Sequence, residues 1–446
     1  MPMHLPITRL WLGPVPLIVT VDPKIIQELL NNDNALEKAW LMKTILKTFI
    51  GDPILISEGK TFPSHAKRNR SILARGFSLS ILKSYFKLFA DQINILTDIL
   101  DKEINKETFF DIYVIFAKTT LDSICASSLG VNINAQQSDS SYFEAMRSGM
   151  HVMMARGFNP LKYPDIIYRF TKDYKETIKC KDIVRSVTTK IISEKRKKVK
   201  NTNHNNVLDS KSVIRNEFKK PLLEYLIDFS KENPDFTDEE LADEVNFTTV
   251  AAFDTLAKSL SLAVVILALY KDVQKRVCDE LFQVLKESNR DEVDFDNLPE
   301  LKYMEMVIKE MMRIFPAVPL IVRELTEDIN IENYTIPKGA NVAIPIYCLH
   351  RNEKYWEDPL KFDPERFLAE DTEKQHPYAF IPFSGGARGC LGSRYAWIFM
   401  KLALAKLLSR YEFHTSIKDL SEIRIELEMT LGIIDGAPVR ITPRQK

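Results

Sequence analysis

An uninterrupted stretch without glycine or proline, from Thr237 to Tyr270, restricts the fold of this chain more than any other feature of its sequence. Thr237 and Glu240 have the spacing of a capping box, which marks the start of a helix. A helix of this length runs for about 50 Å, enough to cross a whole domain. Because its second half is apolar on nearly all sides, we expect this helix to lie at the centre of the protein.

The rest of the sequence predicts mostly helices with a few short strands. Residues 199–220 are polar and indicate a surface excursion rather than a domain boundary. We therefore expect a mainly α protein with small β-sheets, folded as a single domain over residues 1–446. Helices are also expected after Asp22-Pro23, within residues 80–200, from Pro299 to Ile314 and from about Ser393 to Tyr411. Strands are expected at residues 17–21 and within 331–346, with a hairpin turn at Asp435-Gly436.

Composition excludes several classes of protein. The chain has 61 Lys+Arg and 61 Asp+Glu, so its balanced charge gives no support for nucleic-acid binding. Its five cysteines are scattered and form no CxxC pair, which argues against a disulfide framework and a structural zinc site. Prolines and a glycine interrupt the apolar residues at the N-terminus, so neither a signal peptide nor a membrane anchor fits there.

One cysteine lies in a loop that predicts chemistry. Residues 382–392 read PFSGGARGCLG, with four glycines around Cys390 directly before the last expected helix. Glycine lets the backbone approach a large flat group closely. A cysteine near a helix N-terminus is stabilised as a thiolate, which is a soft ligand for iron. A buried structural cysteine beside a glycine-rich turn is the alternative.

The whole pattern, Phe383-x-x-Gly386-x-Arg388-x-Cys390-x-Gly392, resembles the haem-binding signature of the cytochrome P450 family. The resemblance implies the single-domain cytochrome P450 fold, with a long central helix and a loop that carries the cysteine ligand. It also implies a haem (heme, iron protoporphyrin IX) cofactor whose axial ligand is the Cys390 thiolate. Phe383, Gly386, Arg388 and Gly392 are then cofactor-binding residues.

Further motifs agree with this resemblance. Glu310 and Arg313 lie on one face of the helix that ends near Ile314, and they resemble the family's ExxR motif. Residues 362–367, FDPERF, resemble the box that supplies Arg366. The resemblance implies a buried Glu310–Arg313–Arg366 network that fixes the loop carrying Cys390. By itself, the first pair is also typical of an ordinary surface ion pair.

The long helix contains Ala251-Ala252-Phe253-Asp254-Thr255, which resembles the family's oxygen-binding motif. There Ala252 stands where glycine is usual, and it still leaves room for dioxygen. Asp254 and Thr255 are the expected catalytic pair, because an acid can carry protons and a hydroxyl can hold water. Ala251 replaces a glutamate that forms an ester with haem in many members of the family-4 class, so we expect haem without an ester bond.

Two more arginines are expected at the haem propionates. Arg323 and Arg70 match propionate-binding positions of the family, and the guanidinium group suits carboxylates. Ala66 stands where the family has a tryptophan four residues before Arg70, whereas an alternative alignment places Phe62 there. An ordinary solvated helix face is the competing interpretation for residues 67–70.

The resemblance is closest to the microsomal family-4 class of insects and vertebrates, as residues 350–359 and the Trp11 region indicate. It implies a monooxygenase that inserts one oxygen atom of O2 into a C–H bond of a lipophilic substrate: a fatty acid, a terpenoid or a xenobiotic. No dinucleotide-binding fingerprint is visible, so electrons come from a separate NADPH-cytochrome P450 reductase, with cytochrome b5 as a second candidate donor. The expected substrate pocket comprises Val250, Phe253, Pro319, Leu320, Ile321, Leu431 and Ile433.

Two other functions remain open at this stage: a haem-thiolate isomerase or dehydratase, and an inactive haem-binding paralogue. Retention of Asp254 and Thr255 argues against the isomerase, and Ala66 is the departure that favours the paralogue. The class implies the cytosolic face of the endoplasmic reticulum membrane, with an N-terminal anchor that this chain lacks. Membrane association through an anchor is then expected of a longer form, and peripheral association of the chain with the membrane is the alternative.

Overall fold

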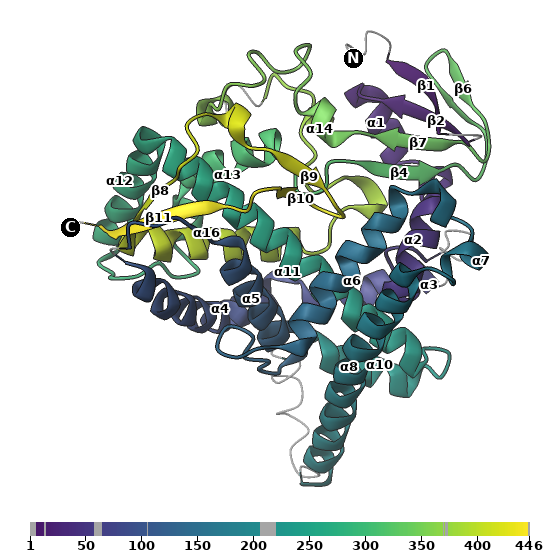
Figure 1. Ribbon diagram of the computed structural model, residues 1–446, viewed down its shortest axis with the longest axis horizontal. Coiled ribbons are helices and arrows are strands. Elements are labelled where there is room, and N and C mark those ends of the chain that lie inside the picture. The colour runs from purple at the N-terminus through teal and green to yellow at the C-terminus, as the bar shows by residue number, and fades with distance from the viewer. Residues whose placement is uncertain are drawn as a thin grey trace.

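The computed structural model describes residues 6–12, 15–57, 65–104, 106–205, 220–368, 370 and 373–444. A helical body surrounds helix α11 (Asp238–Leu269), and a smaller β-rich region lies beside it, next to the N-terminus (Figure 1). The predicted class, mainly α with small β-sheets, is confirmed.

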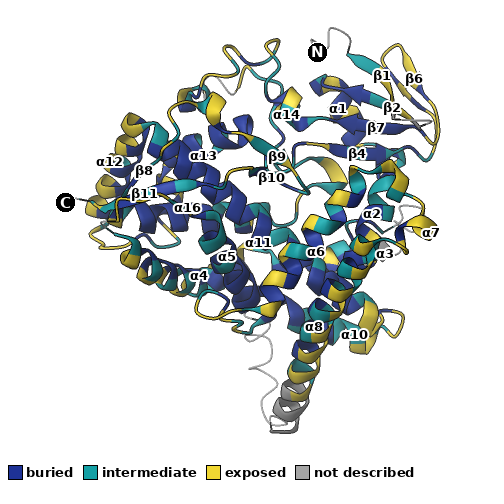
Figure 2. Ribbon diagram, viewed as in Figure 1, coloured by how far each residue is buried: buried dark blue, intermediate teal, exposed yellow. Residues whose placement is uncertain are grey.

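Helix α11 begins and ends as its sequence predicts. The Thr237 side chain caps the helix by accepting a hydrogen bond from the Glu240 N–H at 3.1 Å. The Glu240 carboxylate instead accepts hydrogen bonds from Arg68 and Asn69 of helix α3, so it ties two helices together. Among the described helices, α11 alone is long and apolar enough to cross a membrane, but 83% of its apolar window is buried inside the protein. It is therefore the central helix of the core (Figure 2).

The other helices pack around α11, with α5 lying along it. The longer ones are α2 (Trp40–Ile50), α3 (His65–Gly76), α4 (Leu79–Leu100), α5 (Tyr113–Ile124), α6 (Ser141–Gly157), α8 (Lys172–Asn205), α10 (Leu222–Glu232), α12 (Lys271–Ser288), α13 (Lys302–Ile314) and α16 (Ser393–Arg410). The shorter ones are α1 (Pro23–Leu30), α7 (Asp165–Tyr168) and α14 (Ile346–Leu349).

Four small sheets complete the fold. The largest has the strand order β1-β2-β7-β4 and lies beside α1, where β2 and β7 pair in parallel and the other neighbours are antiparallel (Figure 1). Its strands are β1 (Ile7–Leu12), β2 (Val15–Thr20), β7 (Asn341–Ile344) and β4 (Ile321–Glu324). The others are β3 (Phe110–Asp111)-β11 (Pro438–Pro443)-β8 (Tyr411–His414), β9 (Ile425–Leu427)-β10 (Leu431–Ile433) and β5 (Ile329–Ile331)-β6 (Tyr334–Ile336).

One local prediction is wrong. The Asp435-Gly436 turn forms no hairpin, because β10 pairs with β9 whereas β11 pairs with β3 and β8. The Asp111 carboxylate accepts a hydrogen bond from the Ala437 N–H and directs the chain from one sheet to the next. The polar segment expected from residue 199 onward is helical as far as Asn205, and residues 206–219 lie outside the described residues.

Candidate active site

The loop around Cys390 is held closely against the N-terminal part of the chain. The Cys390 N–H donates to the carbonyl of Phe383 at 2.9 Å, and Gly386 has a φ of +63°. A Cβ atom at position 386 would lie 1.8 Å from the carbonyl oxygen of Leu30 in α1. Glycine is therefore required there both by the backbone conformation and by the space available.

Arg388 forms the second anchor of this loop. Its guanidinium group donates to the backbone carbonyls of Leu36, Ile54 and Ser57 at 3.1, 2.7 and 3.1 Å. The sequence predicted that Arg388 binds the cofactor directly. In the structure these three hydrogen bonds also make Arg388 a link between the cysteine loop and the segments on either side of α2.

The Cys390 thiol is accessible, although protein surrounds most of it. Burial raises the pKa of this thiol. The Gly392 N–H, the Arg70 guanidinium group and the Ser393 N–H, in order of effect, act in the opposite direction and favour the thiolate. Gly392 and Ser393 lie at the N-terminus of α16, as the sequence predicted, where free N–H groups stabilise negative charge. A metal ion would remove the proton outright.

Four cationic side chains gather beside this loop: Lys38, Arg70, Arg323 and Arg388. The Lys38 ammonium group is buried and makes no hydrogen bond or ion pair with any residue that the structure describes. Burial lowers its pKa well below the ordinary value, and the charges of Arg323, Arg388 and Arg70 lower it further. Lys38 was not predicted from the sequence, because the cations around it come from residues far away in the chain.

Arg323, like Lys38, has no anionic partner among the residues that the structure describes. It is 2% exposed, and its hydrogen bond within the described residues goes to the backbone carbonyl of Val322 at 3.2 Å. Burial, followed by the charge of Arg388, lowers the pKa of Arg323 to about 10. Arg70 donates to the Gly389 carbonyl at 2.7 Å. Buried cations are normally paired, so Lys38 and Arg323 fit a ligand that brings carboxylates, as the two propionates of haem do.

The face of α11 that carries Ala251, Ala252 and Thr255 is partly accessible, whereas its neighbours are buried. The Thr255 hydroxyl donates to the Ala251 carbonyl at 2.7 Å. Ala252 therefore lies on the accessible face of α11, where a small side chain was expected. Phe62 and the side chain of Ala66 lie outside the part of the chain that the structure describes.

Asp254 points away from that face and is almost fully enclosed by polar partners. The Tyr113 hydroxyl of α5 donates to its carboxylate at 2.8 Å, and the Thr430 hydroxyl donates to the other oxygen. The Lys258 ammonium group lies 3.2 Å away, one helical turn further along α11. The expected catalytic acid is thus part of a buried ion pair that the sequence analysis did not include, although the Asp254–Lys258 spacing was visible.

The residues predicted to line the substrate pocket differ in exposure. Val250 and Phe253 are 2% and 0% exposed, and the Phe253 ring packs edge-on against Phe143 of α6. Ile321 and Leu431 are also buried, whereas Leu320 is exposed. Pro319 is buried and Ile433 is partly exposed. The sequence could not distinguish core residues from pocket residues, because both are apolar.

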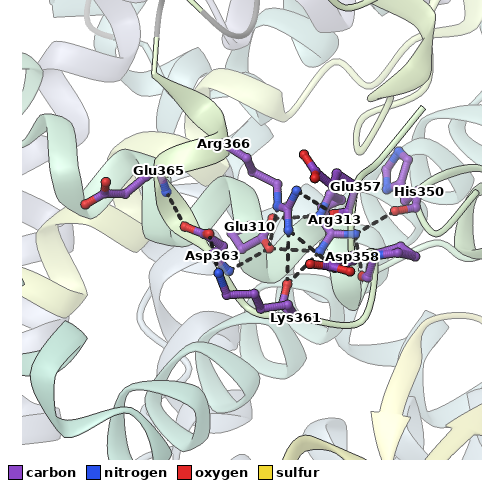
Figure 3. Close-up of polar contacts among 10 residues, drawn as sticks. Glu310, Arg313, His350, Glu357, Asp358, Lys361, Asp363, Glu365 and Arg366 are labelled. Atoms are coloured by element: carbon purple, nitrogen blue, oxygen red, sulfur yellow. Dashed lines mark hydrogen bonds and ion pairs between the residues drawn. The ribbon is translucent and has the colours of Figure 1, made fainter. Parts of the chain in front are cut away.

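Glu310, Arg313 and Arg366 are in direct contact (Figure 3). Arg313 binds both carboxylate oxygens of Glu310, at 2.6 and 2.8 Å, and both side chains are completely buried. Arg366 donates to Glu310 at 3.1 Å. Arg313 also donates to the carbonyls of His350, Pro359 and Lys361, so the network holds the irregular segment before Arg366 against α13.

His350 connects the Glu310–Arg313–Arg366 network to the cysteine loop. Its carbonyl accepts from Arg313 at 2.8 Å, and its Nε2 accepts from the Ile381 N–H at 2.9 Å. Ile381 directly precedes the segment that contains Cys390. Burial lowers the pKa of His350 to about 3, so the ring is neutral and its Nε2 can accept this hydrogen bond.

The fold and this site together define a haem protein with a cysteine thiolate ligand. A family model described as "Cytochrome P450" matches residues 2–433, and the chain belongs to this family. It is 31% identical over 448 residues to "Cytochrome P450 4V2" of Mus musculus, covering 99% of this chain and 83% of that protein.

Relatives in insects are equally similar. "Cytochrome P450 4c21" of Blattella germanica is 30% identical, covering 95% of this chain and 83% of the relative. "Probable cytochrome P450 4aa1" of Drosophila melanogaster is 31% identical, covering 98% and 82%. The solved structure titled "Crystal structure of cytochrome P450DA heme domain" has the same fold, with a TM-score of 0.82 at 20% identity over 99% of this chain and 90% of that one. The chain is a haem-thiolate monooxygenase of the family-4 type.

Replacing Gly386 by alanine should loosen the cysteine loop. We expect Gly386→Ala to lower the thermal midpoint and the haem content of the purified protein, because the added Cβ must displace the Leu30 carbonyl. Gly339→Ala is the matched control, since Gly339 has a φ of +76° and nothing within 4 Å of its Cβ position. Equal losses of haem in the two variants would show that backbone strain alone, and not contact with α1, governs the loop.

Proposed function

We propose that residues 1–446 form one catalytic domain in which Cys390 is the thiolate ligand of the haem iron. The observation that carries this proposal is the accessible Cys390 thiol at the N-terminus of α16, beside Lys38, Arg70 and Arg323, three buried or half-buried cations with no carboxylate partner among the residues that the structure describes. A group that combines a metal with two carboxylates satisfies both the thiol and the cations. The other four cysteines have different surroundings: Cys125, Cys180 and Cys278 are buried, and the cationic side chain that acts on the exposed Cys348 is Arg351.

When bound, haem supplies the activation of O2 and the transfer of one oxygen atom into a C–H bond. We assign Arg70, Arg323, Arg388 and Lys38 to its propionates, with Phe383, Gly386 and Gly392 shaping the loop beneath it. Ala252 leaves room for dioxygen, and Asp254 with Thr255 handles protons. Glu310, Arg313 and Arg366 hold the loop in place from the side of α13.

The proposed substrate is a lipophilic molecule, a fatty acid, a terpenoid or a xenobiotic. Leu320 is the predicted pocket residue with the most accessible apolar surface. The proposed electron donor is NADPH-cytochrome P450 reductase, because this chain has no dinucleotide-binding fingerprint of its own. Cytochrome b5 is proposed as a second donor.

We also propose association with the cytosolic face of the endoplasmic reticulum membrane. The segment around α7 supports this, because its apolar side chains point into solvent: Phe158, Leu161, Ile166, Ile167 and Phe170. Phe170 is 85% exposed. Trp40 of α2, which is also exposed, packs edge-on against Tyr163 of this segment. A continuous set of exposed apolar side chains is typical of a surface that meets a membrane or a partner.

The ligand assignment is tested by the reduced carbon monoxide complex. The wild-type protein is expected to give the strongly red-shifted Soret band that thiolate ligation produces, and Cys390→Ala should lose it. Cys348→Ala, which removes the other exposed thiol, should retain the band. Survival of the band in Cys390→Ala would sink the assignment.

The electron donor is tested by turnover. Product formation from dodecanoic acid, used as a probe, should require both NADPH and the flavoprotein reductase, and neither alone should suffice. Conversion of a substrate in the absence of both would instead favour an isomerase or dehydratase, which needs no external electrons.

Membrane association is tested by sedimentation with phosphatidylcholine vesicles. Phe158→Ser combined with Phe170→Ser should reduce the bound fraction severalfold, because the variant loses apolar area that would enter the lipid. Leu360→Ser is the control, since Leu360 is 69% exposed and lies outside this segment. A loss of binding that is equal in the control would contradict the proposed surface.

A further inference from the structure

A buried carboxyl group on the central helix, Glu244, has one oxygen without a partner. The residue is 0% exposed. Its Oε1 accepts hydrogen bonds from the Ile54 N–H and from the Asn69 Nδ2, both at 2.9 Å. Its Oε2 is buried and has no hydrogen-bond partner within the described residues. Buried polar atoms of folded proteins are nearly always paired, so this oxygen calls for an explanation.

Both partners of Glu244 lie next to anchors of the cysteine loop. The carbonyl of Ile54 accepts a hydrogen bond from Arg388 at 2.7 Å, so α11 holds this residue on one side and the cysteine loop holds it on the other. Asn69 directly precedes Arg70 in α3, and Arg70 donates to a carbonyl of the cysteine loop at 2.7 Å. Glu244 therefore connects the central helix to both arginines through one intervening residue each.

The surroundings of Glu244 favour its neutral acid form. Burial raises the pKa of this carboxyl group to about 8. The hydrogen bonds from Asn69 and Ile54 act in the opposite direction, whereas the carboxylates of Glu240 and Asp243 raise the pKa further. At neutral pH the side chain thus keeps a proton.

In the part of the chain that the structure describes, the cations near Glu244 already have partners. Arg68 of α3 forms an ion pair with Glu240, and Arg185 of α8 forms one with Asp243. Ionisation would place a negative charge on Oε2 beside two carboxylates, and an unpaired buried charge is costly. The site would then have to admit water, which separates α11 from its two partners. The charged groups around Glu244 are Glu240 and Asp243 of α11, Arg68 of α3, Asp52 of the segment after α2, Arg185 of α8 and Arg388 of the cysteine loop.

We infer that the neutral acid form of Glu244 is a positioning residue for the haem. Through Ile54 it keeps Arg388 in place for the propionates. Through Asn69 it does the same for Arg70. The inference rests on the proposed function, in which these arginines bind the propionates. Ionisation of Glu244 loosens both arginines, so the protein holds its haem less tightly at alkaline pH.

The direction of this pH dependence follows from the raised pKa. The folded protein keeps a proton on Glu244 that the unfolded chain loses above the ordinary value of 4.5. The stability that this acid contributes is therefore complete below pH 4.5 and is lost as the pH rises to about 8. Transfer of haem to an excess of apomyoglobin should be slow at neutral pH and should become severalfold faster through a midpoint of about pH 8.

Two substitutions separate the acid form from the ionised form. Glu244→Gln stays neutral at every pH and keeps an oxygen for Ile54 and Asn69, so its haem transfer should stay slow across the range. Glu244→Leu removes that acceptor, so its haem transfer should be fast throughout. The wild type should change from the first behaviour to the second. A role in packing alone would give no alkaline step that glutamine removes.

Asp122→Asn is the matched control. Asp122 is also a buried acid whose pKa is raised by burial, and it accepts the N–H groups of Ala135 and Gln136. Its replacement should leave the alkaline step unchanged. An infrared titration of the carboxylic acid band that Glu244→Gln removes should have the same midpoint as the haem transfer.

Each variant is first checked at neutral pH for the spectrum of its reduced carbon monoxide complex. A normal spectrum with an alkaline step that persists in Glu244→Gln overturns this inference and leaves the assignment of Cys390 intact. A wild-type transfer rate that does not change with pH overturns it as well. If Glu244→Leu fails to fold, Glu244→Gln decides by itself. Absence of the red-shifted band in the wild type would overturn the proposed function, and this inference with it.

Discussion

The buried guanidinium group of Arg313 is the interaction on which the geometry of the site depends. It binds both oxygens of Glu310 and three backbone carbonyls from the segment between His350 and Lys361. That segment has little regular structure, so its own backbone cannot fix its path. Removing one partner of such a pair leaves a buried charge without compensation, at a cost of about 3–5 kcal/mol. The Glu310–Arg313 ion pair, with the hydrogen bonds of Arg313 to three carbonyls, therefore fixes the path of this segment in place of regular secondary structure.

Contacts at both ends of the cysteine loop hold it in position. His350, whose carbonyl is bound by Arg313, accepts the N–H of Ile381 at the start of the loop. At the other end, Gly386 lies against α1, and Arg388 holds the carbonyls of Leu36, Ile54 and Ser57. A ligand atom placed by such distant segments is fixed before any cofactor binds, which lowers the entropy lost on binding.

Features that depend on neighbouring residues could be predicted from the sequence, and features that depend on distant partners could not. The start of α11 was predictable because Thr237 and Glu240 are three residues apart, yet the Glu240 carboxylate binds α3 instead of completing the capping box. The turn at Gly436 was correctly placed, but Asp111 determines which strands follow it. Helix α8 continues to Asn205, a few residues beyond the helical region expected within residues 80–200, because polar residues carry no apolar periodicity that marks where a helix ends.

The same distinction, between patterns of neighbouring residues and contacts with distant partners, applies to the candidate site. The loop around Cys390 and the pair Glu310–Arg313 are local patterns, and a known family pattern covers them. Lys38 lies far from Arg323 and Arg388 in the sequence, so only the fold reveals their shared environment. Phe253 and Val250 are adjacent to Ala251, Ala252 and Thr255 in sequence but are buried, since the accessible face of a helix covers only part of its circumference.

Two buried lysines illustrate how the fold distinguishes a cation that awaits a ligand from one that is already satisfied. Burial acts first on both and lowers the pKa of each ammonium group. For Lys258, Asp254 and Glu428 more than offset this effect and raise the pKa above its ordinary value. For Lys38 the neighbouring charges are all cationic and lower it further. An ammonium group in the second arrangement either loses its proton or is paired by a negative charge from another molecule, and the propionates of haem are the proposed source of that charge.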